Sequence, residues 1–244
     1  MSWFSEFNRI WPFPENYLCI DIETSGLKPT DNMLCTFGWT RVAQRQIVNS
    51  GLFVLNWFAH PAVNAASLER ELEIVASAME AKGDRFFHTA SYLRQYGMPP
   101  VSALSQIATL LRDAESRGEP LVAHNGYGFD AEFLQAHFHD FLGENILIGD
   151  NSMFDTGMAE KASQLSDQDS PLPQAGETMR QWAWRIASLR RKGIMWAART
   201  HCNQRYRIAE RHGLDMSRYH TSDFDTVFLH HLFESQRALA LQAD

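Results

Sequence analysis

Four acidic residues and one histidine, spread over three short segments, carry the chemistry that this sequence indicates: Asp21, Glu23, Asp130, His220 and Asp225. Carboxylate oxygens are the ligands that Mg²⁺ and Mn²⁺ prefer. A histidine, whose unperturbed pKa is about 6.5, suits the role of a general base. Together these residue types predict a two-metal site that hydrolyses phosphodiesters.

The first segment, YLCIDIETSGL at residues 17–27, has an apolar strand pattern that ends in acidic residues. Because side chains alternate along a strand, Asp21 and Glu23 are expected to face the same side. Two carboxylates this close repel each other unless a cation lies between them. Taken alone, the segment is explained equally well by a solvated strand end before a turn at Ser25 and Gly26.

The second and third segments each place an acid on a predicted helix. In LVAHNGYGFDAEFL, a short strand at 121–123 and a turn precede a helix that begins near Phe129 and holds Asp130 in its first turn. The helix dipole favours an acid there whether or not a metal binds. In YHTSDFDT, His220 lies five residues before Asp225, at the start of an apolar helical stripe. A capping histidine and a surface aspartate would give the same local pattern, so the segments have to be considered together.

In this order, the three segments resemble the motifs of the DEDDh 3′–5′ exonucleases, a family with a ribonuclease H-like fold. That family includes the proofreading subunit of bacterial replicative DNA polymerase, RNase T and oligoribonuclease. The matching motifs are DIETSGL at 21–27, AHNGYGFD at 123–130 and HTSDFD at 220–225, within a resemblance that covers residues 17–235. Two stretches, 57–86 and 160–205, are longer than the family pattern. They affect which substrate the resemblance implies, and they do not affect the type of reaction.

The resemblance implies a role for each site residue. Asp21, Glu23 and Asp225 would hold one divalent cation, Mg²⁺ or Mn²⁺, and Asp21 with Asp130 would hold a second. His220 would accept the proton of the attacking water, and the product would be a nucleoside 5′-monophosphate. The implied substrate contacts are Thr24, Leu27, Asn125 and Phe129.

Charge is distributed unevenly along the chain. The net charge is −7, but residues 177–211 contain nine Arg or Lys and two Glu, a local charge of +7 that leaves −14 for the rest. The same segment contains Trp182, Trp184, Trp196 and Tyr206. Interleaved basic and aromatic residues bind phosphates and stack on bases, so Arg190 and Arg191 are candidate substrate contacts. A helix with packed tryptophans and a solvated arginine face explains the segment equally well.

Hydrophobic periodicity indicates the elements that position these residues. It predicts strands at 17–22, 33–41, 46–55, 121–123 and either 146–148 or 153–155, with helices at 67–82, 101–117 and 131–142. The first three strands are expected to form an antiparallel meander. The pattern indicates an α/β fold, a ribonuclease H-like mixed sheet flanked by helices, with a helical insertion before the C-terminal motif. We expect a single exonuclease domain over 1–244, in which 160–205 form an inserted loop and basic helical segment.

Composition limits the class and the compartment. With 45% hydrophobic residues, the 244-residue chain can bury one sizeable core. It has no apolar run long enough for a membrane helix, and its first residues lack the pattern of a secretory signal. Its three scattered cysteines are typical of a reducing cytosol. We therefore expect a cytoplasmic protein without membrane contact, whose N-terminal aromatic residues pack under the first strand.

The sequence thus predicts a metal-dependent 3′–5′ exonuclease that acts on nucleic acid with a free 3′ end, with single-stranded DNA as the expected substrate. An RNA-trimming exoribonuclease of the oligoribonuclease or RNase T type is the main alternative. An inactive nucleic-acid-binding module is a third, which the complete set of acids disfavours. A homodimer, or a polymerase or repair partner, is left open.

Overall fold

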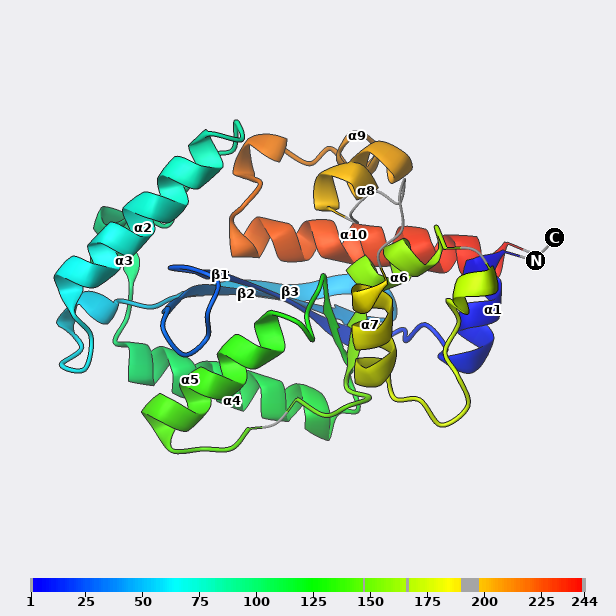
Figure 1. The fold of residues 1–244 in the computed structure, drawn as a ribbon, viewed down its shortest axis with the longest axis horizontal. Coiled ribbons are helices and arrows are strands. Elements are labelled where there is room, and N and C mark those ends of the chain that lie inside the picture. Colours follow the sequence, from blue (N-terminus) through cyan, green and yellow to red (C-terminus); the bar gives the residue numbers. More distant parts are fainter. Residues whose placement is uncertain (1, 147, 166, 190–197, 243–244) are drawn as a thin grey trace.

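A five-stranded mixed sheet forms the centre of the computed structural model, which describes residues 2–146, 148–165, 167–189 and 198–242 (Figure 1). The strands are β1 (Tyr17–Thr24), β2 (Leu34–Ala43), β3 (Gln46–Val54), β4 (Leu121–Ala123) and β5 (Met153–Asp155). Their order is β3-β2-β1-β4-β5; the first three are antiparallel, and β4 and β5 run parallel to β1. The predicted meander and mixed sheet are confirmed, and the fifth strand lies at the second of its two predicted positions.

Helices cover both faces of the sheet. Figure 1 shows α10 along one face, with α8 and α9 on its outer side, and α4 and α5 on the opposite face. The helices are α1 (Trp3–Ile10), α2 (Ala65–Glu80), α3 (Ala90–Tyr96), α4 (Pro100–Ser116), α5 (Asp130–Leu142), α6 (Thr156–Ala162), α7 (Met179–Ser188), α8 (Arg199–Tyr206), α9 (Ile208–His212) and α10 (Ser222–Leu241). Short 3₁₀ turns lie at Trp57–Ala59, Asp167–Asp169 and Met216–Arg218. In the part of the chain that the structure describes, no helix has the length and apolarity to span a bilayer.

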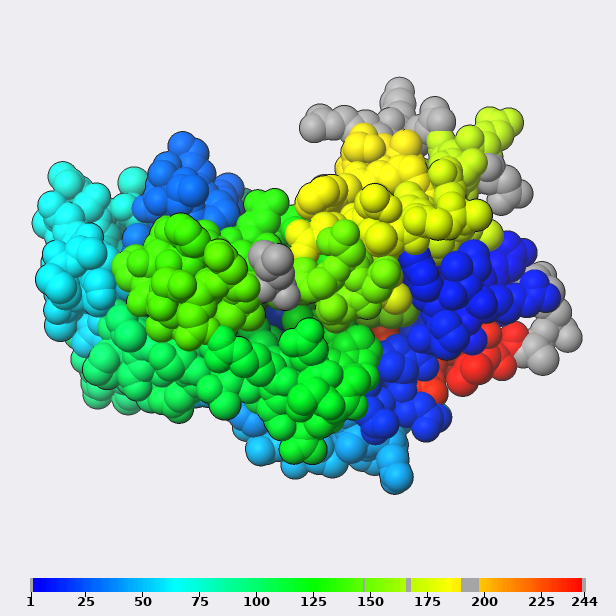
Figure 2. All heavy atoms as spheres, turned by 90° about the horizontal axis from the view of Figure 1, so that it is seen from below, coloured from blue at the N-terminus to red at the C-terminus, as the bar shows by residue number. Residues whose placement is uncertain are grey.

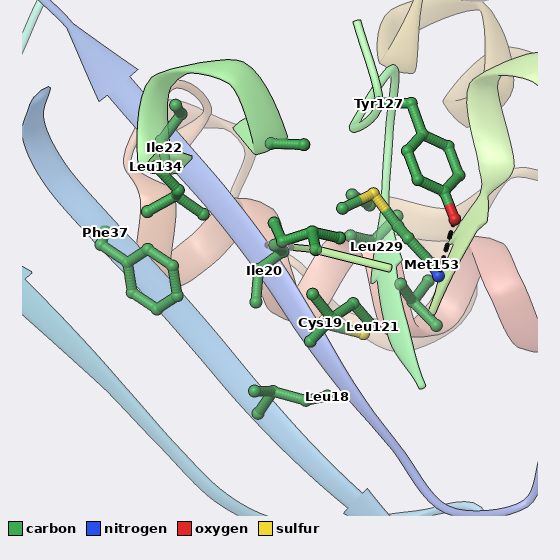
Figure 3. Packing of buried hydrophobic residues seen from close by; sticks show 14 of the residues in the cluster. Leu18, Cys19, Ile20, Ile22, Phe37, Leu121, Tyr127, Leu134, Met153 and Leu229 are labelled. Carbon is green, nitrogen blue, oxygen red and sulfur yellow. Dashed lines mark hydrogen bonds between the residues drawn. The ribbon is translucent and has the colours of Figure 1, made fainter. Parts of the chain in front are cut away.

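The alternation of side chains along β1 decides which face carries the acids. Figure 3 shows Leu18, Ile20 and Ile22 in the core with residues of the neighbouring strands. Tyr17 lies on the α10 face, where its hydroxyl is 2.8 Å from Nδ1 of His230. Because Asp21 is an even number of residues from Tyr17, it faces α10 as well.

Strand β2 fixes the start of α10 opposite these acids. The Thr36 and Ser222 hydroxyls are 2.5 Å apart, and those of Thr40 and Thr226 are 2.8 Å apart. Between the two threonines lies Gly38, where a Cβ would come within 2.2 Å of the Ser222 backbone carbonyl. The missing side chain therefore allows the helix to approach the strand closely.

Three of the N-terminal aromatic residues, Trp3, Phe4 and Phe7, lie on α1, which the sequence did not predict, and α1 packs against α10 and α7. Phe4, Phe7 and Phe13 are buried in the same apolar core as the β1 residues. The Phe7 and Trp182 rings are 5.1 Å apart, and both residues are buried. In Figure 2 the blue N-terminal segment accordingly lies beside the yellow segment that contains α7. The N-terminal aromatic residues thus contact the inserted helix as well as the sheet, where the Phe7 and Phe154 rings are 5.4 Å apart.

Candidate active site

The four acids and the histidine come from three parts of the chain that meet beside the carboxyl end of β1. Asp21 and Glu23 lie on β1, Asp130 is the first residue of α5, and Asp225 lies in the first turn of α10. Asp21 and Asp130 are each 3% exposed and Asp225 is fully buried. The structure thus brings together the residues that the three sequence segments singled out.

Donor atoms in this group suit a hard divalent cation. One ligand atom each from Glu23, His220 and Asp225 lies within 4.8 Å of the others. Two carboxylate oxygens at the site, Oδ2 of Asp21 and Oδ1 of Asp225, are buried without a hydrogen-bond partner. Buried oxygens without a donor are costly unless a cation or a proton satisfies them. The residues therefore fit the metal that the fold class implies.

The pKa values of the acids reflect the same crowding. Burial is the largest cause that raises the pKa of Asp21, Glu23 and Asp130, and it raises the pKa of Asp225 to about 8. The charges of Asp21 and Asp225 further raise the pKa of Glu23, and that of Asp21 raises the pKa of Asp130. A bound divalent cation would reverse these shifts, because it favours the ionised carboxylates.

His220 occupies a strained backbone position immediately before α10. Its φ is +69°, in the left-handed region that non-glycine residues seldom adopt. Nε2 of buried His88 donates to the His220 carbonyl over 3.1 Å, and Nε2 of His220 lies 3.6 Å from Oδ2 of Asp84. Burial is the main cause that lowers the pKa of His220. The imidazole is therefore neutral near pH 7 and able to accept a proton.

Arg199, at the start of α8, is part of this cluster, although the sequence analysis did not single it out. Its Nη1 lies 2.6 Å from Oδ2 of Asp225, and its Nη2 pairs with Oδ1 of Asp21. No spacing distinguishes Arg199 in the sequence, because it is one of nine basic residues in 177–211. Its role depends on the position of α8 over α10.

The predicted substrate contacts occupy different environments. Leu27 is 82% exposed in the loop after β1, whereas the Thr24 side chain is buried and its hydroxyl donates to a backbone carbonyl in that loop. Asn125 has a φ of +69°, and its N–H donates to Oδ1 of Asp155 over 2.9 Å. Phe129 is half-buried at the start of α5. Leu27 is thus the one of the four with a widely exposed side chain.

The described part of the basic segment is largely engaged in internal contacts. Five of its arginines pair with acidic side chains of the protein: Arg180, Arg185, Arg199, Arg205 and Arg207. Trp182 is buried, and the Tyr206 hydroxyl donates to buried Glu160, whereas Trp184 is 49% exposed. Packing and ion pairing therefore account for most of these residues. Arg190 and Arg191 lie outside the described residues.

A surface groove of about 400 Å³ lies away from the acids. It is lined by the N-terminal prolines Pro12 and Pro14, by Leu111 of α4 and by residues of 146–154, which meet on the face seen in Figure 2. None of the five predicted site residues lines it.

The five-stranded mixed sheet with helices on both faces corresponds to the ribonuclease H-like class of folds. Among solved structures, the chain is similar to E. coli exonuclease I: a zinc-bound complex with single-stranded DNA has a TM-score of 0.54 and 15% identity, over 88% of this chain and 39% of that chain. A complex of the same enzyme with a dA16 oligonucleotide has a TM-score of 0.56 and 14% identity, over 93% of this chain and 42% of that chain. At this identity the likeness establishes the fold.

The chain spans less than half the length of these exonuclease I chains. A complex described as exonuclease I with SSB-Ct is similar to the same extent, with a TM-score of 0.54 and 42% of that chain covered. No protein-family model and no curated protein matches the sequence.

Proposed function

We propose that the chain is a DEDDh-type, metal-dependent 3′–5′ exonuclease that releases nucleoside 5′-monophosphates from single-stranded DNA. The observation that carries the proposal is the convergence of Asp21, Glu23, Asp130, His220 and Asp225 at one end of β1. The fold shared with exonuclease I, which has been crystallised with single-stranded DNA, adds support.

Each residue has a defined task in this proposal. Asp21, Glu23 and Asp225 would hold one divalent cation, and Asp21 with Asp130 would hold the second. When bound, the cations would supply Lewis-acid activation of water and stabilise the charge that develops on the phosphate. His220 would accept the proton of the attacking water, which its neutral imidazole is able to do.

The resemblance to the exonuclease family assigns Leu27 to contact with the terminal nucleotide. Leu27 projects into solvent from the loop that follows the acidic strand. An exposed apolar side chain beside a phosphodiesterase site suits contact with the face or edge of a terminal base. In this proposal Thr24 contributes through its backbone, because its hydroxyl is occupied within the loop.

The test is digestion of a 5′-labelled single-stranded DNA and an RNA of the same sequence, with Mg²⁺ or Mn²⁺ and with EDTA. We expect stepwise shortening from the 3′ end with release of 5′-monophosphates, which terminal phosphorothioate linkages block. Asp21→Asn and Asp225→Asn should abolish most of the activity, because each removes a metal ligand. Asp140→Asn, which changes an exposed acid on α5, is the matched control.

Near-normal turnover in both ligand variants would rule out the proposed site. Degradation of the RNA but not of the DNA would favour the exoribonuclease alternative, with the same residues in the same roles.

A further inference from the structure

The Arg199 guanidinium lies between two of the acids that the proposed function assigns to the cations. It contacts Oδ2 of Asp225 at 2.6 Å and pairs with Oδ1 of Asp21. The Arg199 side chain is 14% exposed, and those of Asp21 and Asp225 are 5% and 0% exposed. One buried positive charge therefore bridges a strand acid and a helix acid that are 204 residues apart in the sequence.

Contacts farther along α8 hold Arg199 in reach of the site. Cys202 and Tyr206 are buried against α10 residues in a separate apolar cluster. The Tyr206 hydroxyl donates to Oε2 of Glu160 over 2.7 Å, and Arg205 pairs with the other oxygen of this fully buried acid. These contacts fix α8 against α10 and so hold the Arg199 side chain beside Asp21 and Asp225.

Arg199 occupies one oxygen of each acid, Oδ2 of Asp225 and Oδ1 of Asp21, and leaves their other oxygens buried without a hydrogen-bond partner. A divalent cation held by the same two carboxylates would therefore share them with a like charge in a buried site, where repulsion is strong. We therefore propose that Arg199 is an internal counter-ion: it stabilises the metal-free carboxylates, and a divalent cation must displace it. The inference rests on the proposed function and adds a control over metal loading.

The first experiment measures Mn²⁺ and Mg²⁺ binding by calorimetry in the absence of nucleic acid. Arg199→Met keeps a long side chain and removes the competing charge. We expect it to bind Mn²⁺ about 10- to 100-fold more tightly than the wild type, which is the range for one or two charge-assisted hydrogen bonds. Arg211→Met removes the same charge from an exposed site on α9 and should leave the affinity unchanged. Adding Asp21→Asn to Arg199→Met should weaken binding, which locates the cation.

The second experiment uses the wild-type protein and does not depend on a variant that folds. Phenylglyoxal modification, mapped by mass spectrometry, reports whether an arginine side chain is accessible. Arg199 should be protected in EDTA and become reactive as Mn²⁺ is added. The Mn²⁺ concentration that gives half-maximal modification should match the dissociation constant measured by calorimetry. Arg185, which pairs with Glu177 away from the site, should not change.

The outcomes separate this inference from the proposed function. Equal Mn²⁺ affinity in wild type and Arg199→Met, or weaker binding in the variant, overturns the counter-ion role and leaves the nuclease proposal intact. Protection of Arg199 at saturating Mn²⁺ also overturns it. If neither protein binds Mn²⁺ or Mg²⁺, both proposals fail, and Arg199 is a permanent ion pair.

Discussion

His220 combines an unusual backbone conformation with a position close to three acids. Its φ is left-handed and its carbonyl accepts a hydrogen bond from His88, while its ring is near Asp84 and the Glu23–Asp225 pair. Such local strain persists only where the surroundings enforce it. The geometry leaves two roles for the imidazole, a proton acceptor or a metal ligand, and these predict different measurements.

His220→Asn separates the two roles, because asparagine tolerates the left-handed conformation better than most residues. If His220 is the general base, hydrolysis should slow by roughly 10²–10⁴. Mn²⁺ affinity, measured by calorimetry, should then stay near the wild-type value. A collapse of metal binding in this variant would instead make His220 a ligand and place the base elsewhere.

At the scale of elements, the site depends on how closely α10 approaches β2. Gly38 pairs with Asp21 in the β1–β2 ladder, and its missing side chain allows the Ser222 backbone to lie against the strand. The same helix carries Asp225 in its first turn. The spacing between Asp21 and Asp225 is therefore set by Gly38, which contacts neither the substrate nor the metal in the proposed site.

Gly38→Ala tests this dependence. The added methyl group would lie 2.2 Å from the Ser222 carbonyl, so the start of α10 must shift. Overpacking of this kind costs about 1–3 kcal/mol, and displacement of a metal ligand by about 1 Å can cost about 10²-fold in rate. We expect a lower thermal midpoint of unfolding. We also expect a loss of activity that is larger than the loss of stability alone would cause.

Thr40→Ala is the control for Gly38→Ala. It removes one hydroxyl contact between β2 and α10, 2.8 Å long, but adds no atoms, so it should lower activity less than Gly38→Ala does. If the Gly38→Ala protein retains full activity, the close approach of α10 does not position Asp225.

The elements that follow from local patterns were predictable from the sequence. The strand bearing Asp21 has an apolar alternation and a turn at its end, and α4 has a clear apolar stripe; both lie within a few residues of their predicted limits. The short helices α1 and α3 were missed, because eight and seven residues give little periodicity. Each begins at a side-chain cap, Ser2 for α1 and Thr89 for α3, which is the local signal that could have indicated them.

The contacts that depend on three-dimensional packing were not predictable. Arg199 reaches Asp21 across 178 residues of sequence, and only the folded path of the insertion brings them together. From the sequence, Trp182 could equally stack on substrate bases or pack in the core. Its contact with Phe7 of α1 shows that it packs in the core. No local signal marks a residue whose partner lies at the other end of the chain.

On the scale of the whole molecule, stability depends on buried polar contacts that join the layers. His137 of α5 connects that helix to the sheet: its Nε2 accepts the Leu34 N–H over 3.0 Å, and its Nδ1 donates to the Phe133 carbonyl over 2.9 Å. Both ring nitrogens are therefore used, and only the neutral ring can make both bonds. A second proton on Nε2 would place one N–H against another.

This contact predicts a specific pH dependence of stability. Burial lowers the pKa of His137 from 6.5 to about 4. Between these values the unfolded chain binds a proton that the folded protein excludes, so the contribution is fully present above pH 6.5 and is lost as the pH falls toward 4. The loss has an upper limit of about 3.5 kcal/mol, since one pKa unit corresponds to about 1.4 kcal/mol.

Urea unfolding of wild type and His137→Gln at several pH values between 7.5 and 4.5 measures this contribution, because glutamine does not titrate in this range. The wild type should be the more stable protein at pH 7.5, and the difference in unfolding free energy should shrink steadily below pH 6.5. His139→Gln, which replaces an exposed histidine on the same helix, should show no such convergence. A difference that stays constant down to pH 4.5 would mean that the protonated ring is accommodated, and that the contact between α5 and β2 is not what acid disrupts.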